Sequence, residues 1–170
     1  MSDPADRALL TAIDGDPAAF ERFVALTVAK VTRYCRYLGD PDQIDDVVQD
    51  TYLRAFASMH SFRGDSPAEH WLLVIARRAS AEAIKHNARA RRPELTRRPT
   101  TDEQATAVIE LLIADLPFDQ RRAFVLTQLI GYTYDEAAHF CGCPVGTIRS
   151  RVARARANLT AAFETSKATG

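Results

Sequence analysis

Apolar residues recur at every third or fourth position along nearly the whole of this 170-residue chain. No run of residues alternates apolar and polar side chains between turn signals, as a half-buried strand would. The pattern therefore predicts an all-α protein. A chain of this length with 46% apolar residues can bury one medium core or two small ones, and we expect two small helical domains.

The first domain is predicted to contain three helices, over about residues 17–38, 41–58 and 68–90. The first should end at Gly39, a residue suited to a left-handed helix end. Its buried face is expected to hold Phe20, Val24, Thr27, Val31, Tyr34, Cys35 and Leu38. The second should bury Ile44, Val47, Val48, Thr51, Tyr52, Ala55 and Phe56 and turn its acids to solvent.

The helical periodicity disappears in "RRPELTRRPTTDEQ", residues 91–104, which holds two prolines and two threonine pairs. This composition predicts a flexible linker between domains over residues 1–90 and 105–170. The second domain is predicted to contain four short helices, of which the first two span about residues 105–115 and 118–130.

The other two helices of the second domain are predicted to form a helix-turn-helix. Thr133 and Glu136 have the spacing of a capping box, so a helix should begin there and stop at Gly142. Pro144 suits the first turn of the next helix, where a missing N–H costs nothing. The three-residue break around Gly142 has the length that a helix-turn-helix uses.

The last helix begins in "CGCPVGTIRSRVARAR", which has four arginines and no acid in its final eight residues, although the net charge of the chain is zero. A helical projection puts Ile148, Val152, Ala155 and Leu159 on a core stripe. The opposite face then suits the major groove, with its ridge toward base edges and its flanks toward phosphates. The candidate DNA contacts are Arg149, Ser150, Arg151, Arg154 and Arg156. The alternative is a solvated basic face.

Charge is also segregated within the first domain. Residues 40–50 hold five aspartates and no base, while residues 77–98 hold eight Arg or Lys against two Glu. In the predicted helix over residues 68–90, Leu72, Ala76, Ala79 and Ala83 lie on an apolar side. Arg78, Lys85 and Arg89 lie on a narrow basic stripe. Such a face can follow the phosphates of a nucleic-acid strand.

Three ordered blocks resemble the extracytoplasmic-function (ECF, group 4) sigma factors of the sigma-70 family. "DQIDDVVQDTYLRAF" is similar to region 2.2, "FRGDSPAEHWLLVIARRASAEAIKHNAR" to regions 2.3 and 2.4, and "LPFDQRRAFVLTQLIGYTYDEAAHFCGCPVGTIRSRVARARANL" to the minus-35 binding region 4. Cys141 and Cys143 beside "PVGTIRSRVARAR" resemble the actinobacterial sigma-C-type branch. The resemblance implies promoter-specific transcription initiation with core RNA polymerase.

The resemblance also implies site residues. Docking on the polymerase β′ clamp helices would use Asp46, Gln49, Asp50 and Arg54. Binding of the minus-10 strand would use the loop 59–65 and the following helix, through Arg63, Arg77, Arg78, Lys85 and Arg89. Trp71 is either a stacking platform or a core residue. The family pattern is not matched at Pro67 to His70, at Arg78 and at Glu82, so the minus-10 base preference is the least transferable part of the resemblance.

The remaining partners implied by the resemblance are promoter DNA, the polymerase β flap and, in many members, an anti-sigma factor that clamps both domains. No residue here identifies such a regulator. The chain has no signal-like or membrane-length apolar segment, which predicts a cytoplasmic protein that does not insert into membranes.

Three rival functions are weaker. One rival is a zinc or redox site formed by His139, Cys141 and Cys143 with Cys35. Cys-x-Cys lacks the usual spacing of zinc ligands, and Cys141 falls on a core stripe. We therefore expect reduced thiols and no metal.

A stand-alone helix-turn-helix regulator would not need the acidic block. An enzyme is least expected, because the sequence has no Gly-rich phosphate loop, no metal-ligand cluster and no nucleophile with a matching base. The histidines at 60, 70, 86 and 139 form no constellation.

Overall fold

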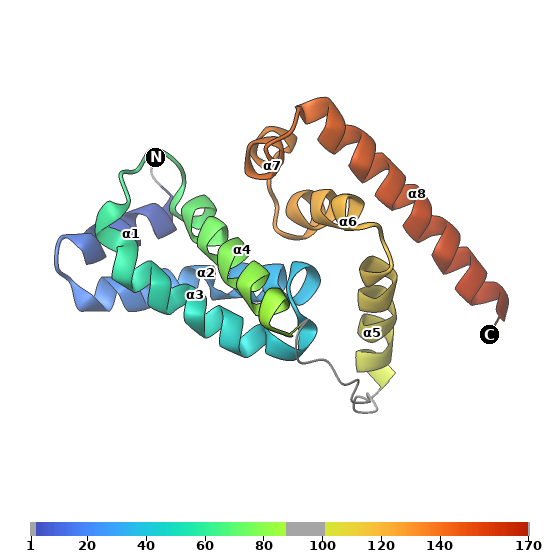
Figure 1. Cartoon of the computed structure of the whole chain (residues 1–170), viewed down its shortest axis with the longest axis horizontal. Coiled ribbons are helices and arrows are strands. Elements are labelled where there is room, and N and C mark those ends of the chain that lie inside the picture. The colour runs from blue at the N-terminus through green and yellow to red at the C-terminus, as the bar shows by residue number, and fades with distance from the viewer. Residues whose placement is uncertain (1–2, 88–100, 170) are drawn as a thin grey trace. The chain divides into compact units, whose positions relative to one another are not determined.

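The computed structural model describes the backbone of residues 3–87 and 101–169 and the side chains of residues 3–86 and 108–165. In these ranges the elements are helices and helical turns, with no strand, so the predicted all-α class is confirmed (Figure 1). The chain divides into two compact units, the first unit over residues 1–90 and the second unit over residues 91–170. No helix in the described part of the chain is both long enough and apolar enough to cross a membrane.

The first unit is a bundle of four helices among its described residues, and each packs against at least two others. They are α1 (Pro4–Ile13), α2 (Pro17–Leu38), α3 (Ile44–Ser58) and α4 (Ala68–Asn87), with 3₁₀ turns at Pro41–Gln43 and Met59–Ser61. The end of α4 beyond Asn87, predicted to reach residue 90, lies outside the described residues.

Helix α1 was not predicted from the sequence, although its start has clear local signals. The Asp3 carboxylate accepts the N–H of Ala5, and Pro4 occupies the first turn. Asp16 and Pro17 start α2 in the same way. Both helices therefore begin where an acid caps the free N–H groups and a proline has none to satisfy.

The predicted left-handed end at Gly39 is wrong. Gly39 has φ −101° and ψ −163°, which is extended backbone that any residue can adopt. The need for glycine is steric instead, because a Cβ at this position would lie 2.6 Å from the carbonyl oxygen of Cys35. The chain leaves α2 too close to its last turn for a side chain.

The core of the first unit lies mostly where the periodicity placed it. In α2 the predicted face is buried from Thr27 onward, but Phe20 and Val24 are only half-buried and Phe23 is fully buried in their place. Phe56 of α3, predicted to be buried, is 55% exposed and covers only the edge of the Phe20 ring, with centroids 5.1 Å apart.

The acidic segment begins differently from the expectation. The helix predicted from residue 41 begins as a 3₁₀ turn and becomes α-helical at Ile44. Just before it, the buried carboxylate of Asp40 accepts the N–H of Asp42 and organises that turn. Asp42, Asp45 and Asp46 are exposed as predicted.

The described elements of the second unit are α5 (Thr101–Ala114), α6 (Phe118–Phe124), a π turn (Val125–Leu129), α7 (Tyr134–Cys141) and α8 (Val145–Thr169). Helix α5 begins inside the segment predicted as linker, since the acids Asp102 and Glu103 suit the first turn of a helix. The rest of that segment, residues 91–100, lies outside the described residues. Helix α8 has 25 residues, so the expectation of four short helices is wrong.

The helix-turn-helix is confirmed at α7 and α8. Thr133 and Glu136 form the capping box, with the N–H of Glu136 bonded to the Thr133 hydroxyl and the N–H of Thr133 bonded to the Glu136 carboxylate. Gly142 ends α7 in the left-handed region, with φ 64°. Pro144 lies just before α8 rather than inside its first turn, and its carbonyl accepts the N–H of Thr147.

Candidate nucleic-acid and polymerase interfaces

The buried side of α8 fixes how the helix presents its arginines. Ile148, Val152 and Ala155 are at most 1% exposed, as the helical projection predicted, and Leu159 is half-buried. Helix α8 packs through this side on α6 and α7. The opposite face is therefore held toward solvent by a rigid helix-turn-helix.

Two arginines on the exposed side of α8 have no ion pair or hydrogen bond among the described residues. They are Arg149 and Arg154, and Ser150 lies between them. The Ser150 hydroxyl donates to the carbonyl of Thr147 at 2.9 Å, so its lone pairs face outward. The exposed side of α8 therefore offers two free guanidinium groups to a ligand.

The other two predicted arginines of α8 are bonded to the unit itself, on opposite flanks of the ridge. Arg151 is half-buried and pairs with Asp119 of α6 at 2.6 Å, and Asp119 also pairs with Arg122 at 3.2 Å. Arg156 donates to the side-chain oxygen of Gln128, in the π turn, at 2.7 Å. Arg149 and Arg154 are thus free to bind a ligand, whereas Arg151 and Arg156 are already bonded within the unit.

Helix α4 carries a second basic face. Leu72, Ala76 and Ala79 are buried against the bundle and Ala83 is half-buried. Among the predicted contacts, Arg78 and Lys85 are exposed, Arg77 is half-buried, and Arg89 lies outside the described residues.

The loop before α4 has two buried anchors and an exposed tip. Met59 and Phe62 are at most 9% exposed. The ring of half-buried Trp71 lies 5.5 Å from that of Phe62, so Trp71 supports the loop from beneath. Arg63 is exposed, and Gly64 has φ 75°, a conformation that suits glycine. The loop therefore exposes its tip just before the helix that carries the basic face.

Helix α3 brings together the residues predicted for polymerase docking. Asp46 and Gln49 are exposed and Asp50 is half-buried, all on one side of the helix. Arg54 pairs with Asp50 at 2.9 Å and with Glu82 of α4 at 2.6 Å. Hydrogen bonds to Glu82 and to Asp50 raise the pKa of Arg54, and the bond from Arg54 lowers the pKa of Glu82. Arg54 therefore links α3 to α4 through its ion pair with Glu82, and it also lies at the surface predicted for polymerase docking.

Sequence reasoning missed Leu53, which is 64% exposed and lies on the same side of α3 as Asp46, Gln49 and Asp50. Its spacing from Asp50, Gln49 and Asp46, which is three, four and seven positions along a helix, was the signal available in the sequence. Phe56, 55% exposed, lies one turn further along. An exposed apolar centre beside acids is typical of a protein interface.

Comparison with known proteins decides the family. A model of Sigma-70 region 2 matches residues 20–90, and a model of Sigma-70 region 4 matches residues 106–159. The ECF RNA polymerase sigma factor SigC of Mycobacterium tuberculosis is 45% identical, over 95% of this chain and 92% of its own length. This chain belongs to the ECF sigma factors. As such it binds core RNA polymerase and promoter DNA and directs promoter-specific initiation.

Other relatives agree with this assignment. The ECF sigma-E factor of Haemophilus influenzae is 32% identical over 89% of this chain and 91% of its own length. The structure of CnrH in complex with the cytosolic domain of CnrY matches with a TM-score of 0.77 and 27% identity, covering 96% of this sigma factor and 99% of CnrH. The sigma factor RpoE of Bartonella quintana, solved with the anti-sigma factor NepR, matches with a TM-score of 0.71 and 29% identity over 85% of this chain and 96% of its own.

Cys35 lies in the first unit, and Cys141 and Cys143 lie in the second. Cys35 is buried, and burial raises the pKa of its thiol to about 11. Cys141 is half-buried rather than in the core, where Phe140 lies instead. Cys143 accepts a hydrogen bond from Arg151 at 3.7 Å. Within the described residues, no three His, Cys, Asp or Glu side chains are grouped for a metal.

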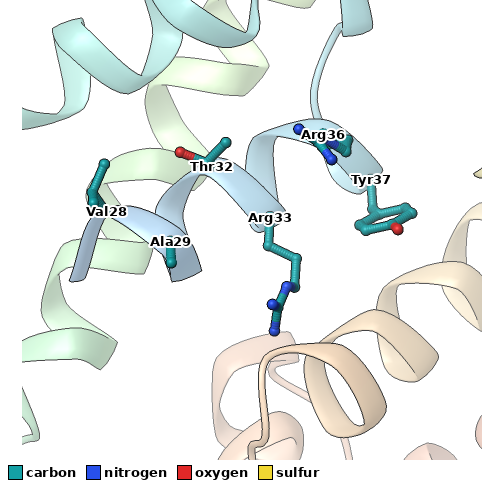
Figure 2. A pocket seen from close by; sticks show the side chains of 6 residues that line it. All are labelled: Val28, Ala29, Thr32, Arg33, Arg36 and Tyr37. Carbon is teal, nitrogen blue, oxygen red and sulfur yellow. The ribbon is translucent and has the colours of Figure 1, made fainter. Parts of the chain in front are cut away.

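A shallow hollow on α2 was not predicted from the sequence. Figure 2 shows the side chains along it: Val28, Ala29, Thr32, Arg33, Arg36 and Tyr37. The lining combines apolar and basic groups and contains no carboxylate, thiol or imidazole. The hollow therefore lacks the paired groups that acid–base chemistry would need.

Proposed function

We propose that this sigma factor binds the minus-35 element with α8, captures the minus-10 strand with α4 and the loop before it, and docks on the polymerase β′ clamp helices with α3. The domains are residues 1–90 and 105–170, joined by residues 91–104, and the second also contacts the β flap. The protein acts in the cytoplasm and positions DNA without a catalytic step of its own.

The exposed arginine ridge of α8 carries this proposal. A recognition helix must turn an unpaired polar face to the major groove while its back is packed, and α8 combines both properties. Ser150 and Arg154, opposite the core stripe, can reach base edges. Arg149 and Arg156 on one flank and Arg151 on the other suit the phosphate backbones. In the free protein the Arg151 guanidinium already bonds to Asp119, and the Arg156 guanidinium already bonds to Gln128.

The minus-10 assignment rests on the surface formed by Arg63, Arg78 and Lys85. A single strand is bound by positive charge along its backbone together with a protein surface that accepts unstacked bases. Arg77, half-buried, and Arg89 complete the proposed set. Trp71 supports the loop through Phe62, so we assign it to packing instead of base stacking.

Docking on the polymerase rests on the exposed side of α3. Asp46, Gln49 and Asp50 supply charge and hydrogen bonds, and Leu53 supplies an apolar centre. Arg54 contributes from the edge of this surface, where its guanidinium already bonds to Glu82. Such an acidic surface with an apolar centre suits a basic, amphipathic coiled coil.

An anti-sigma factor is the proposed regulator. The Bartonella quintana relative was solved with an anti-sigma factor, and CnrH with the cytosolic domain of CnrY. This chain matches both folds over most of its length. We therefore infer that a protein partner can hold it away from the polymerase.

Transcript mapping tests the proposed function. The purified chain is added to actinobacterial core RNA polymerase over fragmented genomic DNA, and the 5′ ends of the transcripts are sequenced. New starts that share two spaced motifs support the proposal and define both elements. DNA binding by α7 and α8 without new starts would contradict it.

Arg154→Ala is expected to weaken binding selectively at one minus-35 base pair, by about 1–3 kcal/mol if its contact is bidentate. Arg156→Ala should weaken all sequences alike, because a phosphate contact carries no base information. Holoenzyme binding to promoter fragments with each minus-35 position varied measures both effects. Equal losses over all fragments for both variants would reject the assignment of ridge and flank.

Asp119→Asn is expected to strengthen binding to duplex DNA of any sequence, because Arg151 would no longer share its charge with a carboxylate. The gain should be at most about 1 kcal/mol, as for other solvent-exposed ion pairs, and should fall with added salt. Asp115→Asn, which removes the same charge from another exposed acid of the second unit, is the control. Weaker binding of Asp119→Asn would mean that the pair positions Arg151 for its phosphate.

A further inference from the structure

Helix α4 begins without a side-chain cap from its own segment. The carbonyl of Pro67 accepts the N–H of Trp71, so Pro67 is the residue at which the helix starts. Proline has no side-chain oxygen, and it cannot cap the free N–H groups of the first turn. Water or a partner from elsewhere in the chain can satisfy them instead.

Asp6 supplies this cap from α1. Its carboxylate oxygen Oδ1 accepts the N–H of Ala68 at 2.7 Å, across 62 residues of sequence. Asp6 is half-buried and Ala68 is fully buried, so little water competes for the bond. The negative charge also lies at the positive end of the α4 dipole.

Asp6 is itself held firmly. It lies in the first turn of α1. Ala5, Ala8 and Leu9 are buried, and α1 contacts α2, α4 and the turn at Met59–Ser61. The carboxylate therefore ties the start of α4 to a rigid neighbour.

The tie lies at one end of the proposed minus-10 loop. Met59 and Phe62 anchor the loop where it leaves α3, and the Asp6 bond anchors it where it enters α4. The exposed tip between these anchors carries Arg63 and Gly64. We propose that Asp6 is a positioning residue for minus-10 recognition, which holds this loop and the first turn of α4 in the geometry that binds the strand.

This inference rests on the proposed function, which assigns the loop and α4 to the minus-10 strand. It adds α1 to the recognition apparatus, although the region 2 family model matches only from residue 20 onward. Asp6 touches no DNA in this proposal and acts through the backbone of Ala68.

The test uses holoenzyme reconstituted from core RNA polymerase and the full-length chain. The probe is a fluorescent fork-junction DNA whose single-stranded arm carries the minus-10 element returned by transcript mapping. Asp6→Ala should weaken fork binding about tenfold, the scale of a lost helix cap. Asp6→Asn should lose less, because its amide oxygen still accepts the bond, and affinity for core polymerase should not change.

Asp3→Ala is the matched control. It removes the cap of α1 itself and leaves the α4 cap in place, so its fork binding should stay near the wild-type value. Equal fork binding by Asp6→Ala and Asp3→Ala would overturn the inference. A parallel loss of core affinity by Asp6→Ala would also overturn it, since the residue would then be merely structural.

Arg63→Ala and Arg78→Ala separate this inference from the proposed function. If both weaken fork binding and Asp6→Ala does not, the minus-10 site is correct and the positioning role is wrong. If neither weakens it, the site assignment is wrong and the role of Asp6 falls with it.

Discussion

Phe23→Ala is expected to lower the free energy of unfolding of the first unit by about 3–5 kcal/mol. Phe23 is fully buried in α2, with its ring 6.0 Å from that of Phe20. Alanine would leave a cavity that the surrounding helices can close only in part, and its cost is a large fraction of the stability of a small domain.

Urea denaturation followed by tryptophan fluorescence measures this loss. The chain has one tryptophan, Trp71, and it lies in the first unit, so the signal reports that unit alone. Leu26→Ala is the control, because Leu26 lies on the same helix and is 49% exposed. It should change stability by less than about 0.5 kcal/mol. An unchanged midpoint for Phe23→Ala would show that this core does not support the bundle.

Leu53→Ala is expected to weaken binding to core RNA polymerase by about 1.5–3 kcal/mol, the value of burying a leucine side chain completely. Leu53 is 64% exposed in the free protein, so its truncation removes little folding stability. A titration of labelled sigma factor with core polymerase measures the dissociation constant directly.

Leu10→Ala is the matched variant for this experiment. Leu10 is also an exposed leucine of the first unit, 44% accessible, but it lies on α1 and away from the proposed docking surface. Its dissociation constant should equal that of the wild type. Equal constants for Leu53→Ala and Leu10→Ala would mean that α3 does not dock on the polymerase through this side.

Local signals explain why so much of the fold was predictable. Helix α2 was predicted over its observed residues because its apolar spacing is regular and Gly39 interrupts it. The break between α7 and α8 followed from a capping box and a left-handed Gly142, both of which depend on residues a few positions apart. The reason assigned to Gly39 was wrong, since its constraint is contact with the Cys35 carbonyl and no positive φ is involved.

Other features depended on packing that spacing alone does not show. Helix α1 is short and has few large apolar residues, so it was missed. Phe56 was assigned to the buried side of α3 and still lies at the surface, although Ala55 before it and Met59 after it are buried. The π turn at Val125–Leu129 interrupts a segment whose apolar spacing predicted one continuous helix.

The sequence alone determined the helical class, the helix-turn-helix, the acidic and basic faces and the resemblance to ECF sigma factors. Periodicity and capping act over a few residues, so these features can be recognised without a structure. The tertiary structure decided which charged side chains are free and which are engaged. Arg151 meets Asp119 across 32 residues, Arg54 meets Glu82 across 28, and Asp6 caps α4 across 62. Contacts at such separations exist only after the helices have packed.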